Sequence, residues 1–453
     1  MMDPAVPAVS LLACAASGFV LWESLSPSTA KPPATYVALA ALAVAFALSR
    51  RTFALFSSVT GEMRFPTRLE YVAGGCFLGL IGIALLHNEM LRRRSSPDVA
   101  VTHALPLVAA CGGILALWSP NLMSLGMGIG LYGVAWWAAG QWKRGTVEAT
   151  LGPLSLLLGV ALLYNGTATF NIASLGRFLW QHGEPQPLGL YLGLGLVLGG
   201  IVLPTGLIPP FGAFDEAGNS PVSHLLGLLV LLRLGLHLGA VAWECFWVCL
   251  LLSLACLAWG WATALSQTLH DPLRRIWGLL AAQRGFLLLA LSFVFRGQDL
   301  ALLVTVAAAY ALVQSVARLS LRWLSATGDV APKRLLSSAM VEMPLVGVPL
   351  CLALLSLIGL PPTLCFIVRA EVVRLAWTLG LTWLAPFVAA MSILAFWVLG
   401  PWMLPLLRGE GESVGLPPPW PVRIALMLAA ICLVVLGLFP LPLVQLAGWL
   451  VGG

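Results

Sequence analysis

Long apolar segments alternate with short polar gaps along almost the whole chain of 453 residues. A transmembrane helix needs about 20 predominantly apolar residues, with a range of roughly 17–25. On that criterion the pattern predicts fourteen spans, two of them interrupted by adjacent prolines. The predicted spans are 8–25, 34–49, 69–87, 103–119, 121–142, 147–170, 188–208, 221–241, 244–266, 273–295, 299–320, 341–371, 381–407 and 421–449. We therefore expect an all-α polytopic membrane protein.

Composition agrees with this pattern and excludes several classes of function. The chain is 60% hydrophobic and 9% charged, whereas a soluble domain carries about 25% charged residues. Every predicted loop is short, and the chain has no glycine-rich phosphate-binding pattern. Cys245, Cys249 and Cys256 share a helix face, but no histidine or carboxylate joins them at ligand spacing. We expect no flavin, nucleotide, iron–sulfur cluster or metal in this chain, and no nucleic-acid partner.

Lysine and arginine residues in the predicted loops, counted together with Arg274, Arg275, Arg318 and Arg423 near the ends of predicted spans, are divided unequally between the two sides of the membrane. One side holds fourteen of them and the other holds seven. Cytoplasmic loops carry the excess of positive charge, so the richer side is assigned to the cytoplasm. We expect a multi-pass protein of the plasma (inner) membrane with both termini on the non-cytoplasmic side.

The two proline interruptions resemble each other. Pro209 and Pro210 end the seventh predicted span, and Pro361 and Pro362 lie inside the twelfth. Adjacent prolines break a helix, which a membrane tolerates only against protein or a water-filled cavity. Matching breaks in two halves indicate a duplicated transporter architecture, although the first pair also fits ordinary loop punctuation.

This symmetry predicts inverted five-helix repeats with helices 7 and 12 broken. The predicted segments are an N-terminal three-helix segment at 1–102, a first repeat at 103–241, a second repeat at 242–407 and a C-terminal helix at 408–453.

Three further arginines, Arg233, Arg284 and Arg369, are assigned to the membrane interior, while all three lysines fall in polar gaps. A charge in the membrane interior is costly and usually marks a pathway or a buried pair. An arginine keeps its proton, whereas a desolvated lysine can lose it. The predicted membrane region therefore carries fixed positive charges and no lysine able to cycle a proton.

Other polar residues near these charges are candidates for an ion pathway. His237 stands four residues after Arg233 on one helix face and changes charge near neutral pH, so it is a candidate relay. The alternative is that both side chains bond to backbone or lipid headgroups. Gln283 is a candidate either to hold a water chain or to form an interhelical hydrogen bond. Glu342 is a candidate proton entry group or an interfacial carboxylate, and Glu371 is spaced to pair with Arg374.

Four stretches of the chain carry motifs of a known family. They read LSLIGLPPTLCFIVR at 355–369, LSQT at 265–268, DPLRRIWGLLAAQRGF at 271–286 and SPVS at 220–223, with a weaker match in NLMSL at 121–125. In this order they resemble the antiporter-like membrane subunits of respiratory complex I, in particular those of the subunit N type of NADH-quinone oxidoreductase. The resemblance implies a membrane subunit that moves protons while partner subunits, which carry flavin and iron–sulfur clusters, pass electrons to quinone.

The resemblance also implies a mid-membrane proton relay. The family carries a glutamate on span five, lysines on spans seven and eight, and a lysine or glutamate on span twelve. The matching positions here are Asn121, one of the three residues 199–201 (Gly, Gly, Ile), Leu231 and Arg369. The resemblance therefore implies a subunit-N-like protein with reduced or altered ion translocation. Two alternatives stay open, an independent secondary ion or solute transporter of the same fold and a purely structural scaffold subunit.

Overall fold

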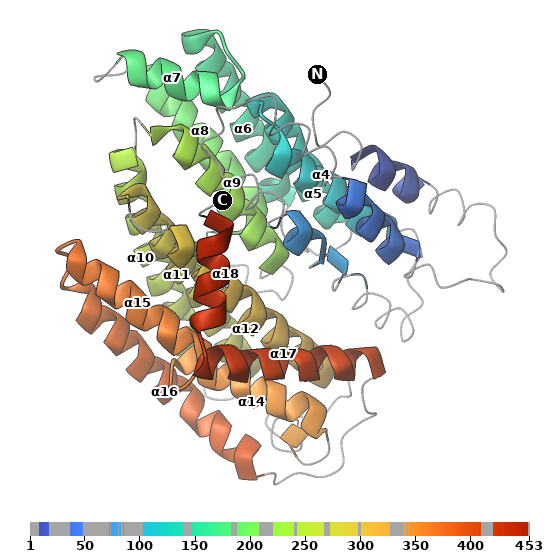
Figure 1. Cartoon of the computed structure of the whole chain (residues 1–453), viewed down its shortest axis with the longest axis vertical. Helices are drawn as coiled ribbons and strands as arrows, with labels where there is room; N and C mark the ends of the chain where they lie inside the picture. Colours follow the sequence, from blue (N-terminus) through green and yellow to red (C-terminus); the bar gives the residue numbers. More distant parts are fainter. Residues whose placement is uncertain are drawn as a thin grey trace, which may run out of the picture. The chain divides into compact units, whose positions relative to one another are not determined.

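The computed structural model shows a helical protein (Figure 1). It describes residues 9–17, 37–48, 72, 74–79, 81–82, 85, 103–138, 146–182, 188–207, 221–239, 242–266, 272–297, 300–326, 339–340, 343–408 and 420–451. Within these ranges the regular elements are helices, and strand-like pairing is limited to an isolated bridge between Asn121 and Asn171. The predicted all-α class is confirmed.

The chain divides into two compact units, Met1–Cys245 with Gly452–Gly453, and Phe246–Val451. Besides helical stretches at 9–17 and 37–48, the first unit contains the helices α4 (Leu105–Trp118), α5 (Leu122–Ala138), α6 (Thr146–Thr167), α7 (Ile172–His182), α8 (Leu188–Thr205) and α9 (Pro221–His237). Those of the second are α10 (Ala242–Ser266, whose first turn precedes the division), α11 (Pro272–Phe295), α12 (Leu300–Ala326), α14 (Pro344–Ile358), α15 (Leu364–Thr378), α16 (Leu384–Arg408), α17 (Trp420–Leu438) and α18 (Leu441–Val451).

Glycines let the helices of the first unit pack at backbone distance. A Cβ atom added at Gly112 of α4 would lie 2.6 Å from the carbonyl oxygen of Gly128 on α5. One added at Gly159 of α6 would lie 2.7 Å from the carbonyl oxygen of Gly193 on α8. Small residues at such contacts are typical of membrane helices, where close van der Waals packing replaces the hydrophobic effect.

The short helix α7 was not predicted from the sequence, which placed a loop between the sixth and seventh spans. Its residues Ile172, Leu175 and Leu179 are buried, while Arg177 and Trp180 are exposed. An apolar face opposite a polar one is the pattern of a helix that lies at a membrane surface. This helix contacts α9, where Gly176 approaches the backbone carbonyl group of His237.

In the second unit, α12 contacts α11, α14, α15, α17 and α18. In an 18-residue apolar stretch of α11 within Arg275–Phe295, 94% of the residues are buried, whereas 33% are buried in Leu384–Pro401 of α16. We infer that α11 is an interior helix and that α16 presents a broad apolar face to lipid or to a neighbouring chain.

Five described helices are long and apolar enough to cross a membrane, or six if one bent pair counts as a span. The count of fourteen and the inverted repeats stay predictions. The twelfth predicted span is broken, as expected, into α14 and α15.

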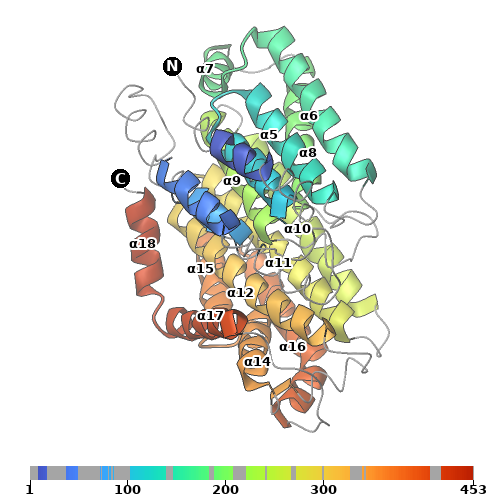
Figure 2. The same ribbon diagram turned by 90° about the vertical axis from the view of Figure 1, so that its right-hand side faces the viewer.

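The prediction that the fourteenth span is one continuous helix is wrong. Helices α17 and α18 meet at 92° (Figures 1 and 2). The hydrogen bonds of α17 run as far as Phe439, whose amide donates to Val435. The next residue, Pro440, has no amide hydrogen to continue the helix.

Candidate functional site

The break between α14 and α15 is built from a left-handed glycine and two prolines. Gly359 has φ 80° and donates its amide to the carbonyl groups of Leu355 and Ser356, which ends α14. Pro361 and Pro362 follow, and α15 begins at Leu364. A left-handed glycine after the last helical residue is a common helix stop. The break leaves the last two carbonyl groups of α14, those of Leu357 and Ile358, without backbone donors from a following turn.

Arg369 supplies the missing donors. Its Nη2 atom donates to the carbonyl oxygen of Leu357 at 2.6 Å, and its Nη1 atom donates to that of Ile358 at 2.5 Å and to Ser392 Oγ at 2.6 Å. The Arg369 Cζ atom lies 5.2 Å from the centre of the Phe286 ring, within cation–π range. The side chain is only 5% exposed. The guanidinium group therefore joins α15 to α14, α16 and α11.

Gly359 also makes room for this arrangement. A Cβ atom at that position would overlap Arg369 Nη1 and would lie 2.9 Å from Cζ. The positive φ and the close approach both require glycine here.

A buried pair is one of the two roles expected of a charge inside a span, but the described contacts of Arg369 offset its charge in a different way. Among its described contacts no carboxylate occurs; its acceptors are two carbonyl oxygens and a hydroxyl group. The C-terminal end of a helix carries partial negative charge, so the guanidinium group lies where a cation is favoured. Arg369 remains a proton-retaining charge with short, directional bonds to its neighbours.

Arg233 on α9 has a similar kind of partner. Its Nη1 atom donates to the carbonyl oxygen of Leu117, in the last turn of α4, and the side chain is 5% exposed. His237 is half-buried, and its Nδ1 atom lies 2.9 Å from the carbonyl oxygen of Arg233, so Nδ1 is the donor. These contacts agree with the alternative in which both side chains bond to backbone.

The other positions that the resemblance assigns to the relay carry no ionisable group. Asn121 is exposed and lies just before α5. Its backbone forms an isolated antiparallel bridge with that of Asn171. Leu231 is buried in α9.

Of the three residues that match span seven, packing closes Gly200, whereas a Cβ atom at Gly199 meets only Ser155 Oγ, at 3.8 Å. A Cβ atom at Gly200 of α8 would lie 2.5 Å from Leu156 Cβ and 2.6 Å from its backbone nitrogen. A lysine at Gly200 would therefore require α6 and α8 to separate.

Between α11 and α12 the structure places polar residues that sequence reasoning missed. Gln314 is 1% exposed, and its Nε2 atom donates to the carbonyl oxygen of Leu280 at 2.6 Å. Gln314 thus forms an interhelical hydrogen bond of the kind that the sequence analysis offers for Gln283. Gln283 itself is half-buried. Arg318, which had been counted as a cytoplasmic loop charge, is buried in α12 with its Cζ atom 5.5 Å from the centre of the Trp277 ring. Polar side chains recur at positions 310, 314 and 318, which share one helix face. This spacing is the sequence signal that could have predicted the buried polar residues of α12.

A second missed contact lies in the first unit. Tyr132 Oη on α5 and Ser223 Oγ on α9 are 2.6 Å apart, and both residues are buried. Either hydroxyl group can donate. No pattern in the sequence marks this pair, because 91 residues separate its members.

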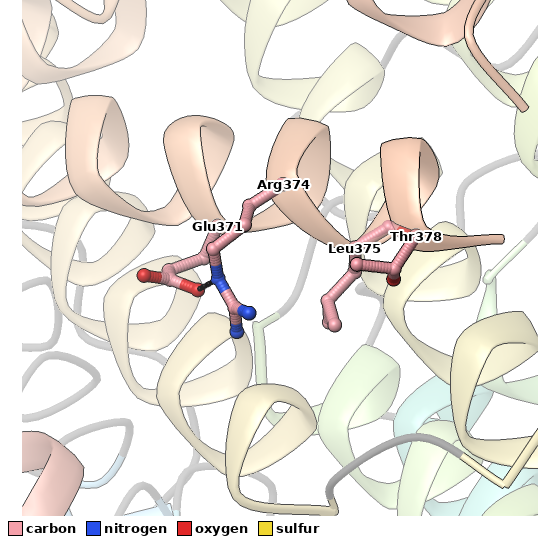
Figure 3. Close-up of polar contacts among 4 residues, drawn as sticks. All are labelled: Glu371, Arg374, Leu375 and Thr378. Atoms are coloured by element: carbon pink, nitrogen blue, oxygen red, sulfur yellow. Dashed lines mark hydrogen bonds and ion pairs between the residues drawn. The ribbon is translucent and has the colours of Figure 1, made fainter. Parts of the chain in front are cut away.

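The predicted ion pair on α15 is confirmed. Arg374 Nε and Glu371 Oε2 are 2.7 Å apart, with the side chains 63% and 43% exposed (Figure 3). Their spacing on one helix turn and their exposure fit a structural salt bridge outside the interior. Glu342, Pro209 and Pro210 lie outside the described residues.

Comparisons with known proteins agree on one family. The family model described as NADH:quinone oxidoreductase/Mrp antiporter, TM, matches residues 143–395. A sequence relative, NADH-quinone oxidoreductase subunit N of Mycobacterium sp. (strain JLS), is 27% identical over 397 residues, which is 82% of this chain and 82% of the relative.

Solved structures share the fold. A chain of the membrane-bound sulfane sulfur reductase (MBS), an archaeal respiratory membrane complex, superposes with a TM-score of 0.74 at 17% identity, covering 99% of this chain and 98% of that one. A chain of the Mrp complex from Dietzia sp. DQ12-45-1b gives 0.71 at 16% identity, covering 100% and 97%. A chain of respiratory complex I from Thermus thermophilus with bound Aureothin gives 0.66 at 23% identity, covering 96% and 98%.

Proposed function

Because the chain belongs to the NADH:quinone oxidoreductase/Mrp antiporter family of membrane proteins, we propose that it is a subunit-N-like membrane component of a complex I or a related membrane-bound oxidoreductase. In this role it has lost the lysine and glutamate relay, so its own ion translocation is reduced or altered. The observation that carries this proposal is the bonding of Arg369. A group that passes protons must give its proton up, whereas this guanidinium group keeps it and donates to three oxygen atoms.

The first unit supports the same conclusion. Gly200 is one of the three residues that match the family's span-seven lysine, and it packs directly against Leu156. Leu231, at the span-eight position, is buried and apolar. Loss of a relay lysine at Gly200 through substitution alone would leave room for that side chain. At Gly200 the packing of α6 against α8 leaves none.

The proposal requires partner subunits, and it differs in this respect from an independent transporter. The solved relatives are chains of multi-subunit membrane assemblies, as the descriptions of MBS, the Mrp complex and complex I state. We therefore propose that this chain assembles with other membrane subunits of an oxidoreductase. The test is to extract the native membrane gently and identify the co-migrating chains. Migration of this chain by itself would favour the independent transporter.

The topology proposed for the chain gives an expected result for its C-terminus. Loop charges place both termini on the non-cytoplasmic side, and moving buried Arg318 out of the loop count leaves thirteen charges against seven. A C-terminal reporter that is active only in the cytoplasm should therefore be silent, while its fusion to a cytoplasmic loop should be active. A strong cytoplasmic signal from the C-terminal fusion would mean that the span count is wrong by one.

The isolated chain is expected to bind no flavin, nicotinamide, haem or metal. The predicted loops are too short to enclose such a group, and the apolar helices offer no phosphate-binding glycine pattern. Absorption spectroscopy and elemental analysis of partner-free protein check this expectation. A stoichiometric chromophore or metal would contradict it.

A further inference from the structure

Three oxygen atoms converge on the guanidinium group of Arg369. They are the carbonyl oxygens of Leu357 and Ile358, at the end of α14, and Ser392 Oγ on α16. Each lies 2.5–2.6 Å from an Nη atom of Arg369. They are neutral groups from two helices, and the two carbonyl groups are available because α14 stops at Gly359.

Such a set of atoms suits a small cation. The last carbonyl groups of a helix carry its partial negative charge. Unwound carbonyl groups and the C-terminal ends of broken helices coordinate sodium ions or protons in transporters. Oxygen atoms of carbonyl and hydroxyl groups are also the ligands that hard cations prefer. No carboxylate occurs among the described contacts of Arg369. The three neutral oxygen atoms therefore suit a cation with one positive charge and not one with two.

We propose that Arg369 is a tethered cation that fills an oxygen-lined site for a monovalent cation at the break between α14 and α15. This inference rests on the proposed function, in which Arg369 is a fixed charge. It adds that the three oxygen atoms around Arg369 form a site that can bind a free cation. Removal of the side chain should therefore leave a site that takes a guanidinium ion or a sodium ion from solution.

The surroundings of the site predict an order of preference. The Phe286 ring, 5.2 Å from Arg369 Cζ, offers a face to a planar cation. A guanidinium ion reproduces both the ring contact and the directional bonds, so it should bind more tightly than sodium. Choline is too large and lacks a hydrogen-bond donor on its nitrogen, so it should not bind.

The test measures the thermal unfolding midpoint of the full-length protein, purified in detergent together with any partner subunits that remain bound. Arg369→Ala is compared with the unmodified protein, with Arg369→Lys, which keeps a tethered charge, and with Arg374→Ala, which removes an exposed guanidinium group from the same helix. Each is titrated with millimolar guanidinium chloride, sodium chloride or choline chloride at constant ionic strength. If Arg369→Ala does not accumulate, Arg369→Met, which keeps the apolar stem, takes its place.

In the variant without the charge, guanidinium should raise the midpoint in a saturable way. The rise is roughly 2 °C when the ion reaches ten times its dissociation constant. Sodium should give a smaller saturable rise, and the other three proteins should show neither. The proposal is overturned if the charge-free variant responds to all three salts alike, or if Arg374→Ala responds as strongly. Neither result would alter the proposed loss of the proton relay, which is tested separately by proton counting.

Discussion

Replacing Arg369 with leucine is expected to prevent normal assembly of the membrane complex. Leucine leaves the carbonyl groups of Leu357 and Ile358 buried without donors. A buried acceptor without a partner costs about 1–3 kcal/mol, so two of them cost about 2–6 kcal/mol. That is a large part of a typical folding stability of about 5–15 kcal/mol. The amount of this chain in the assembled complex, measured on native gels, should fall severely.

Two matched variants separate the bonds of Arg369 from the general effect of losing an arginine. Arg369→Lys keeps a charge and donors near the end of α14, so assembly should be preserved. Arg374→Leu removes an arginine from the same helix, but its ion pair with Glu371 is exposed and contributes only about 0–1 kcal/mol. Equal losses in Arg374→Leu and Arg369→Leu would show that the buried contacts are not the cause.

Substitution of Gly200 should be the second most damaging change. Even alanine places a Cβ atom 2.5 Å from Leu156 Cβ, which forces α6 and α8 apart. Overpacking of this kind typically costs about 1–3 kcal/mol. Gly200→Lys should cost more, because it adds a charge inside the membrane at about 2.5–3.5 kcal/mol. We expect lower unfolding midpoints for both variants in detergent, with the lysine variant the lower.

Gly195→Ala on the same helix is the control for these variants. A Cβ atom at Gly195 meets no atom within 4 Å. This change should leave the midpoint unchanged, because it places nothing in the contact with α6. If Gly200→Lys were as stable as Gly195→Ala, Gly200 would be open to a lysine, and the packing of α6 against α8 would not exclude one there.

The elements set by local chemistry could be predicted from the sequence. Pro361 and Pro362 lack backbone donors, so the break in the twelfth span followed from two residues. The pairing of Glu371 with Arg374 followed from helical spacing. The positions of the buried arginines in apolar runs were also visible. Each of these features depends on neighbours within one helix turn.

Features that depend on distant partners could not be predicted in the same way. The acceptors of Arg369 include Ser392, 23 residues later, and the acceptor of Arg233 lies 116 residues earlier. Gln314 reaches a carbonyl group on the neighbouring helix that no side-chain pattern marks. No sequence pattern marks the carbonyl groups that accept from Arg369, although a helix end can offset a positive charge as a carboxylate does.

Two errors in the predicted helices have simpler causes. Helix α7 was missed because its eleven residues are too short and too polar on one face for a search based on apolar length. The bend at Pro440 was missed because apolar residues continue on both sides of it. In both cases hydropathy set the expected boundary, whereas hydrogen bonding and burial set the real one.

The most direct test of the proposed loss of the proton relay is the number of protons moved per electron pair by the complex reconstituted in vesicles. The unmodified complex is compared with those carrying Arg369→Lys and Arg369→Leu, each normalised to the amount of assembled complex. Because Arg369 holds the end of α14 and keeps its proton, we expect the same number in every complex that assembles. An Arg369→Leu complex that assembles normally yet moves fewer protons per electron pair would place Arg369 in a working pathway and contradict this account.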